Sequence, residues 1–261
     1  MSDLSGETFK ETDVASVYVH RSPYAPQVYQ TLIQNAPGRA RLLDLGCGEG
    51  KIARRLAGEF REVVTVDPSS AMIAVGKSLE NGNAGNLTWV EARAEEALLT
   101  GAFDVVTFAS SIHWMDPGVL FAKLAQHVTP DHLIGIIAGD QPFAPPWDAD
   151  WRGFLEKWVP VASGRPLGAP EWQGLRDRHL AYIDVLQSHD FVSGEVRQSV
   201  EDHILCQHAR NTFAVSKLGP RLSRFREELR ALLAPHADPQ GMLTFRVKTH
   251  LTLARLMGET A

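Results

Sequence analysis

The stretch Arg41-Leu-Leu-Asp-Leu-Gly-Cys-Gly-Glu-Gly50 decides the fold of this 261-residue chain. It is typical of an apolar strand that runs into a glycine turn, and a second apolar run, Val63-Val-Thr-Val-Asp-Pro68, follows after a helical segment. Glycines at positions 46, 48 and 50 let the backbone turn sharply and approach a ligand closely. Asp67 lies 21 residues after Gly46, near the position where a strand-helix-strand unit places a ribose-binding acid. The pattern therefore predicts a nucleoside-bearing cofactor at the carboxyl end of the first strand.

The charge of the turn indicates which nucleoside. A dinucleotide-binding turn carries a third glycine, but that position is Lys51, and the turn has acids on both sides, Asp44 and Glu49. A carboxylate would repel a pyrophosphate, yet it suits an ammonium or a sulfonium group. S-adenosylmethionine carries both of these groups, and its ribose diol can donate to Asp67. We therefore expect this cofactor.

The motif Asp44-Leu-Gly-Cys-Gly-Glu-Gly50, with the Val-Asp-Pro ending of the next strand, resembles the class I S-adenosylmethionine-dependent methyltransferases. A narrower resemblance is to the small-molecule group that includes trans-aconitate methyltransferase (methyltransferase type 11). Residues 17–24, Val-Tyr-Val-His-Arg-Ser-Pro-Tyr, and residues 110–116, Ser-Ser-Ile-His-Trp-Met-Asp, carry that second likeness. The resemblance implies methyl transfer to a small organic acceptor.

The composition favours a compact enzyme. The chain is 44% hydrophobic, has no apolar run near the roughly 18 residues of a spanning helix, and starts without the pattern of a signal peptide. Two cysteines, Cys47 and Cys206, make neither a disulfide framework nor a metal-ligand spacing. The net charge of −5 gives no basic field for nucleic acid. We expect a cytoplasmic monomer or homodimer with a small-molecule substrate, no metal, no nucleic-acid partner and no membrane contact.

Short apolar runs alternate with helical segments, which predicts a parallel sheet with crossovers. The expected strands are 42–45, 63–66, 87–90, 103–108, 133–138, 191–200 and 242–253, and the expected helices are 51–57, 69–81, 117–127, 175–188 and 221–233. The order is similar to the family's α/β, doubly wound, Rossmann-like, seven-stranded sheet, whose last strand is antiparallel. We divide the chain into a lid segment (1–36), a cofactor-binding core (37–140), an inserted cap between strands five and six with a helix (141–190) and the C-terminal part of the sheet (191–261).

The inserted cap is rich in tryptophan, with Trp147, Trp151, Trp158 and Trp172 close together. These rings predict either a roof over an active site or a satellite hydrophobic cluster. If the acceptor is a carboxylate, Arg152 or Arg165 in the cap is a candidate to hold it.

The cofactor-binding residues follow from the motif and the resemblance. Asp44 is expected at the methionine ammonium and Asp67 at the ribose diol, while Arg93 stands where the family often has an acid near the adenine amino group. The resemblance places Tyr18 and Arg21 of the lid near the methionine carboxylate. The full predicted set is Tyr18, Arg21, Asp44, Gly46, Cys47, Gly48, Asp67, Pro68, Met72, Arg93, Ala94, Ala109 and Ser110.

The acceptor should enter above the carboxyl ends of the first and fourth strands. His113 is the candidate general base, because imidazole titrates near neutral pH, and a packing role is the alternative. The predicted substrate-binding set is Tyr24, His113, Trp114 and Trp147. Oxygen is the expected acceptor atom, in a carboxylate or a hydroxyl. Two other functions stay open: a cyclase that releases methylthioadenosine, and a non-catalytic cofactor-binding module.

Overall fold

A computed structural model describes residues 6–168 and 177–258 of the chain. The chain divides into two compact units. The sheet unit comprises residues 26–139, 173–191 and 249–261, and the helical unit comprises residues 1–25, 140–172 and 192–248. The first 25 residues thus belong with the helical unit, and their role as a lid stays a prediction.

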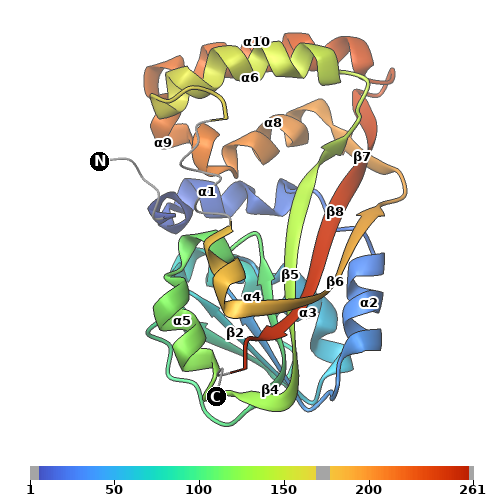
Figure 1. The fold of residues 1–261 in the computed structure, drawn as a ribbon. Coiled ribbons are helices and arrows are strands. Elements are labelled where there is room, and N and C mark those ends of the chain that lie inside the picture. The colour runs from blue at the N-terminus through green and yellow to red at the C-terminus, as the bar shows by residue number, and fades with distance from the viewer. Residues whose placement is uncertain (1–5, 169–176, 259–261) are drawn as a thin grey trace. The chain divides into compact units, whose positions relative to one another are not determined.

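The central sheet has the predicted α/β architecture (Figure 1). Its strands are β1 (Arg41–Leu45), β2 (Glu62–Asp67), β3 (Leu87–Glu91), β4 (Phe103–Ala109), β5 (Val128–Phe143), β6 (Ile183–Val192), β7 (Val196–Ser199) and β8 (Met242–Leu256). The order is β3-β2-β1-β4-β5-β8-β6, and the pairs among β1 to β5 are parallel. Figure 1 shows β8 running opposite to β5, so the antiparallel last strand is confirmed. The structure adds an eighth strand, because the short β7 pairs antiparallel with β8.

The helices of the sheet unit lie on both faces of the sheet, as a doubly wound fold requires (Figure 1). They are α2 (Gln27–Asn35), α3 (Lys51–Leu56), α4 (Ser70–Ser78) and α5 (Pro117–Leu124). Ser69 caps α4 by accepting from the Met72 N–H at 3.2 Å, and Asp116 caps α5 by accepting from the Val119 N–H at 3.2 Å. An oxygen at each N-cap satisfies a backbone donor that has no partner inside the helix, so these two helices begin where the sequence predicts.

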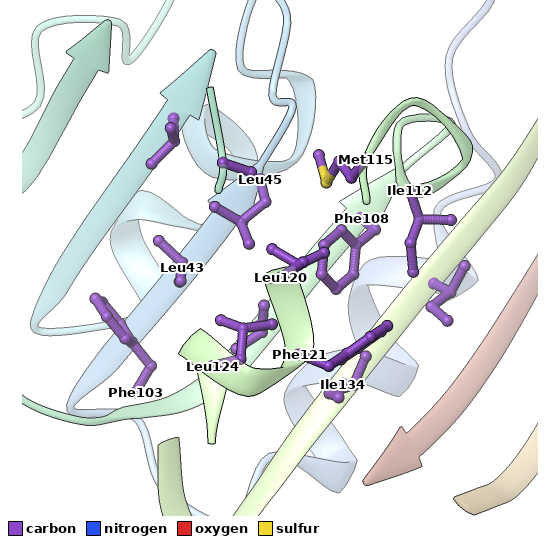
Figure 2. Packing of buried hydrophobic residues seen from close by; sticks show 14 of the residues in the cluster. Leu43, Leu45, Phe103, Phe108, Ile112, Met115, Leu120, Phe121, Leu124 and Ile134 are labelled. Atoms are coloured by element: carbon purple, nitrogen blue, oxygen red, sulfur yellow. The ribbon is translucent and has the colours of Figure 1, made fainter. Parts of the chain in front are cut away.

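Leucine and phenylalanine side chains fill the space between the sheet and α5 (Figure 2). Leu120 and Leu124 of α5 are fully buried, together with Leu43 and Leu45 of β1. Burying one such side chain contributes about 1.5–3 kcal/mol relative to leaving it exposed. This packing fixes the carboxyl end of β1, from which the glycine turn starts.

The helical unit has its own aromatic core. Its helices are α1 (Thr12–Val17), α6 (Asp148–Ser163), α8 (Val200–His208), α9 (Val215–Leu218) and α10 (Leu222–Leu233), and α6 runs beside α10 (Figure 1). Trp147 is 1% exposed and packs against Phe245 and His203, with ring centroids 5.9 and 5.6 Å away. The burial of Trp147 and Trp158 in one cluster fits the satellite-core interpretation of the tryptophans. Trp172 lies outside the described residues.

Single turns of 3-10 helix connect many of these elements. They are η1 (Glu7–Lys10), η2 (Tyr18–His20), η3 (Ala57–Glu59), η4 (Ile112–Trp114), η5 (Arg178–Tyr182), η6 (Asn211–Phe213), η7 (Gly219–Arg221) and η8 (Ala234–His236). No helix within the described ranges is long and apolar enough to cross a membrane.

The segment before the last strand differs from the prediction. The helix expected over 175–188 is wrong from residue 183 onward, because the 3-10 helix η5 is followed by β6, which starts eight residues before the strand expected at 191. Residues 175 and 176 lie outside the described part of the chain. β6 is an edge strand with Ile183 as its buried residue, so its sequence lacks the alternation that a half-buried strand shows. The predicted strand over 191–200 also ends early, since α8 begins at Val200.

Candidate functional site

The glycine turn after β1 has the strained geometry that only glycine adopts easily. Gly46, Gly48 and Gly50 all have positive φ angles, of 64°, 56° and 72°. The N–H groups of Gly46 and Cys47 both donate to the Val66 carbonyl, at 2.8 and 3.1 Å, and so tie the turn to β2. A Cβ atom on Gly46 would lie 2.5 Å from the Ser111 Cβ atom. A side chain at position 46 would therefore displace the segment after β4 or distort the turn.

Asp67 ends β2 beside this turn, as predicted. Its Oδ2 atom accepts from the Gly48 N–H at 2.8 Å, and its Oδ1 atom accepts from the Ser69 N–H at 2.9 Å. The residue is 8% exposed. Because each carboxylate oxygen can accept more than one hydrogen bond, the fixed carboxylate can also receive two ribose hydroxyls.

Asp44 is a fully buried carboxyl in β1. It lies opposite Thr107 of β4, whose hydroxyl donates to Asp44 Oδ1 at 2.8 Å. Asp44 Oδ2 has no hydrogen-bond partner among the described residues. Burial is the main cause that raises the pKa of Asp44 to about 7, and the negative charges of Asp67 and Glu49 add to it, against the Thr107 hydrogen bond that lowers the pKa. A buried, unpaired carboxylate oxygen is costly, so this atom suits a cationic donor such as a ligand ammonium.

Glu49 has a different role from the one that its place in the sequence indicates. Its carboxylate pairs with Arg54 Nη2, and Arg54 Nε donates to the Glu49 carbonyl at 2.8 Å. The Glu49 charge is therefore balanced within the protein, and it does not add to the negative charge offered to a ligand. The carboxylates that would repel a pyrophosphate are therefore those of Asp44 and Asp67.

The predicted adenine-side residues lie at two places in the sheet unit. Met72 is 1% exposed on α4 and Ala94 is 5% exposed after β3, whereas Pro68 and Arg93 are exposed. Glu95 Oε1 accepts from the Asp116 N–H at 2.7 Å, and so ties the segment after β3 to the start of α5.

Ala109 ends β4, Ser110 follows it, and both residues are half-buried. Ser110 has a φ of 55°, which costs a residue other than glycine about 1 kcal/mol or more. The next residue, Ser111, was not predicted, and its hydroxyl donates to the Leu45 carbonyl at 2.7 Å. This bond holds the segment after β4 against the end of β1.

His113 and Trp114 form η4, with ring centroids 4.5 Å apart. Arg178 Nη2 donates to the His113 and Met115 carbonyls, at 3.4 and 3.2 Å, and so braces this turn. The structure thus places the predicted substrate-binding residues His113 and Trp114 on the same segment after β4 as Ser110, which was predicted to bind the cofactor. Arg178 had no signal in the sequence, because its partners are backbone carbonyls 63 and 65 residues away.

The other predicted site residues belong to the helical unit. Arg21 donates from Nε and Nη2 to Asp140 Oδ2, both at 2.5 Å, and its guanidinium lies 5.1 Å from the centre of the Tyr18 ring. Tyr24 is 7% exposed. Trp147 lies in the aromatic core described above, which gives it a packing role whether or not it also contacts a substrate.

The histidines of α8 serve local structure. His203 Nδ1 lies 3.0 Å from Gln198 Oε1, and His208 Nδ1 lies 2.9 Å from the Phe213 carbonyl. Among the residues that the structure describes, no group of three or more His, Cys, Asp or Glu side chains gathers as a metal site requires.

Comparison with known proteins identifies the part of the chain that contains the turn. Residues 42–131 match a family model described as a methyltransferase domain. An uncharacterised methyltransferase of Mycobacterium tuberculosis is 31% identical over 117 residues, which are 45% of this chain and 46% of that protein. Trans-aconitate 2-methyltransferase of Deinococcus radiodurans is 31% identical over 110 residues, covering 41% and 40% of the two chains. Malonyl-[acyl-carrier protein] O-methyltransferase of Magnetococcus marinus is 26% identical over 178 residues, covering 66% and 58%.

Each of these alignments spans less than two thirds of the relative's length. A solved structure of a candidate type II methyltransferase from Anaeromyxobacter dehalogenans extends the similarity of fold. It has a TM-score of 0.64 and 22% identity, and the match covers 90% of this chain and 96% of that one. With the acidic glycine turn and the strand order, these matches identify residues 42–131 as a methyltransferase domain that is similar to the class I S-adenosylmethionine-dependent enzymes.

Proposed function

We propose that this protein transfers a methyl group from S-adenosylmethionine to an oxygen atom of a small organic acceptor. The observation that carries the proposal is Asp44: a fully buried carboxyl beside the glycine turn with one oxygen that no described residue satisfies. The methionine ammonium of the cofactor would supply the missing donor. Asp67, fixed by two backbone N–H groups, would receive the ribose diol.

The bound cofactor would supply an electrophilic methyl group, and the protein's own part is to align the acceptor and exclude water. Ser110 and His113, on the segment that Ser111 ties to β1, are the polar residues proposed to meet the acceptor. If the acceptor is a carboxylate, it is already a nucleophile and needs no base. If it is a hydroxyl, His113 is the residue proposed to take its proton.

Two relatives support an oxygen acceptor in an acid. The names of trans-aconitate 2-methyltransferase and malonyl-[acyl-carrier protein] O-methyltransferase both denote carboxylic acid substrates. We also propose a cytoplasmic location, which the two free cysteines, Cys47 and Cys206, favour because a reducing compartment keeps thiols unpaired.

The test is incubation with methyl-labelled S-adenosylmethionine and a panel of small acids, phenols and amines. Methyl transfer leaves S-adenosylhomocysteine and a labelled acceptor. Formation of methylthioadenosine would instead favour the cyclase alternative. Micromolar binding of S-adenosylhomocysteine without turnover on any acceptor would favour a cofactor-binding module. Asp44→Asn, which keeps the shape of the side chain, should weaken cofactor binding, while unchanged affinity in this variant would contradict the proposed role of Asp44.

A further inference from the structure

Arg210 is a mostly buried cation with few partners. It follows α8 in the helical unit, and its side chain is 16% exposed. Nη1 lies 3.4 Å from Asp140 Oδ1, and Nη2 lies 4.0 Å from Cys206 Sγ. A guanidinium has five N–H donors, so most of those on Arg210 have no acceptor among the described residues. The guanidinium is therefore held mostly out of bulk water while it keeps donors that can reach an acceptor from the solvent side.

Asp140 cannot balance Arg210 alone, because it already binds Arg21. Both contacts from Arg21, through Nε and Nη2, go to Asp140 Oδ2 at 2.5 Å, and Arg21 Nη1 donates to the Ala209 carbonyl at 3.5 Å. The two arginines therefore lie on the two oxygens of one carboxylate. Two cations and one anion leave this cluster, Arg21, Asp140 and Arg210, with a net charge of +1.

The side chains next to Arg210 on α8 do not supply the missing negative charge. Burial, together with the positive charge of Arg210, lowers the pKa of His203 to about 4, so this imidazole is neutral near pH 7. Cys206 is a buried free thiol. On the other side, Tyr18 presents its ring to Arg21, which tolerates a cation but does not neutralise it.

We propose that Arg210 binds a carboxylate of a small organic acid, with the Arg21–Asp140 pair holding the site rigid. A guanidinium matches a planar carboxylate by two parallel hydrogen bonds. One carboxylate neutralises the net charge of +1, whereas a doubly charged phosphate would leave an excess of negative charge next to Asp140. The inference stands apart from the proposed methyl transfer, because it concerns a binding site within the helical unit.

The experiment is isothermal titration of the full chain at low salt with malonate, glutarate and citrate, each compared with its amide. The wild-type chain should bind at least one acid ten or more times more tightly than the amide. Arg210→Gln should lose at least tenfold of that affinity, and Arg210→Lys should fall between the two, because an ammonium keeps the charge but loses the paired hydrogen bonds. Arg224→Gln is the control, since Arg224 is 70% exposed and pairs with Glu228 at 2.9 Å, and it should change the affinity less than twofold.

A second measurement separates binding from folding. The preferred acid should raise the melting temperature of the wild-type chain and not that of Arg210→Gln. Without the acid, Arg210→Gln should melt at the same temperature as the wild type or higher, because it removes a poorly paired buried charge.

Three results would overturn the inference. They are no acid bound in preference to its amide, equal binding of phosphate and carboxylates, and a larger loss of S-adenosylhomocysteine affinity than of acid affinity in Arg210→Gln. The last result would assign the residue to the methionine carboxylate of the cofactor. Normal S-adenosylhomocysteine binding without acid binding leaves the proposed methyl transfer intact, whereas failure to bind S-adenosylhomocysteine contradicts the proposed function itself.

Discussion

The two units of this protein bury charges of opposite sign. In the sheet unit, Asp44 is a carboxyl with one unsatisfied oxygen, and Asp67 is held by two backbone N–H groups. In the helical unit, Arg21 and Arg210 share the single carboxylate of Asp140. The first arrangement favours a cationic ligand with hydroxyl groups, and the second favours an anion. The comparison shows that the sign of a buried charge that is not fully paired within the protein indicates the opposite sign for the ligand.

The units also differ in how they use large side chains. The glycine turn depends on the absence of side chains, because a Cβ atom at position 46 would meet Ser111. The helical unit instead packs Trp147, Trp158 and Phe225 into one core. Five predictions test how the two units differ.

Trp147→Ala should lower the free energy of unfolding by about 3–5 kcal/mol, because it leaves a cavity where a ring 1% exposed packs against Phe245. Urea denaturation measures this change. Trp147→Phe is the matched control, and it should retain most of the stability because it keeps a ring. If the alanine variant loses less than about 1 kcal/mol, Trp147 is not important for the core. The prediction that Trp147 binds the substrate would then be the better explanation of this residue.

Asp67→Ala should weaken binding of S-adenosylhomocysteine well over tenfold, because the buried ribose diol loses its acceptor. Calorimetry measures the affinity. Asp104→Ala is the control: Asp104 accepts from the Ala40 and Arg41 N–H groups, at 2.7 and 3.0 Å, near the amino end of β4. The control should reduce stability and leave the affinity unchanged, so equal losses of affinity in both variants would count against a specific diol site.

Asp44 should make cofactor binding depend on pH. Its pKa of about 7 means that the carboxyl is largely protonated at pH 5.5, so the affinity should rise about tenfold between pH 5.5 and pH 7 as the carboxylate forms. Asp44→Asn should abolish that rise, and a pH profile that is the same in both proteins would contradict the assignment.

The same residue should affect the stability of the ligand-free protein in the opposite direction. The folded state holds the Asp44 proton more tightly than the unfolded chain, whose carboxyl has a pKa near 3.8. Stability should therefore fall as the pH rises from about 4 to 7, and this fall should be smaller in Asp44→Asn.

Glu228→Gln should have the smallest effect. The hydrogen bond from Lys157, with those from Arg224 and Trp158, lowers the pKa of Glu228 to about 2 against a small opposing effect of burial. The stabilisation is thus present above about pH 4.5 and is lost as the pH falls toward 2. Because the site is close to solvent, the variant should lose about 1 kcal/mol or less at pH 7. Melting temperatures at pH 7 and pH 3 test this, since the gap between variant and wild type should shrink at the lower pH.

The sheet unit could be predicted closely from the sequence because its signals are local. Apolar runs marked β1, β2 and β4, and Ser69 marked the start of α4. The glycine turn and Asp67 were found by their spacing, and the structure places both where the motif indicates. The neutralisation of Glu49 by Arg54 was missed, although a Glu and an Arg five residues apart across a helix start were visible.

The helical unit could be predicted less well, because its structure depends on contacts between distant residues. Arg210 forms an ion pair with Asp140, which lies 70 residues earlier in the chain, and no spacing in the sequence indicates that pair. One local signal for α8 was available: Ser199 accepts from the Asp202 N–H at 3.0 Å, the pattern of a capping serine followed by an acid. The edge strand β6 gave no such signal, since most of its side chains are exposed on both faces.

Ser110 places backbone strain beside the proposed acceptor site, at a φ of 55°. A glycine at position 110 would relieve that strain, but it would also remove the hydroxyl group that follows β4. The sequence with the least strain at this position therefore differs from the sequence that keeps the hydroxyl. Selection for thermal tolerance alone would therefore favour the loss of a polar group at the proposed acceptor site, and libraries screened for stability should be checked for turnover at this position.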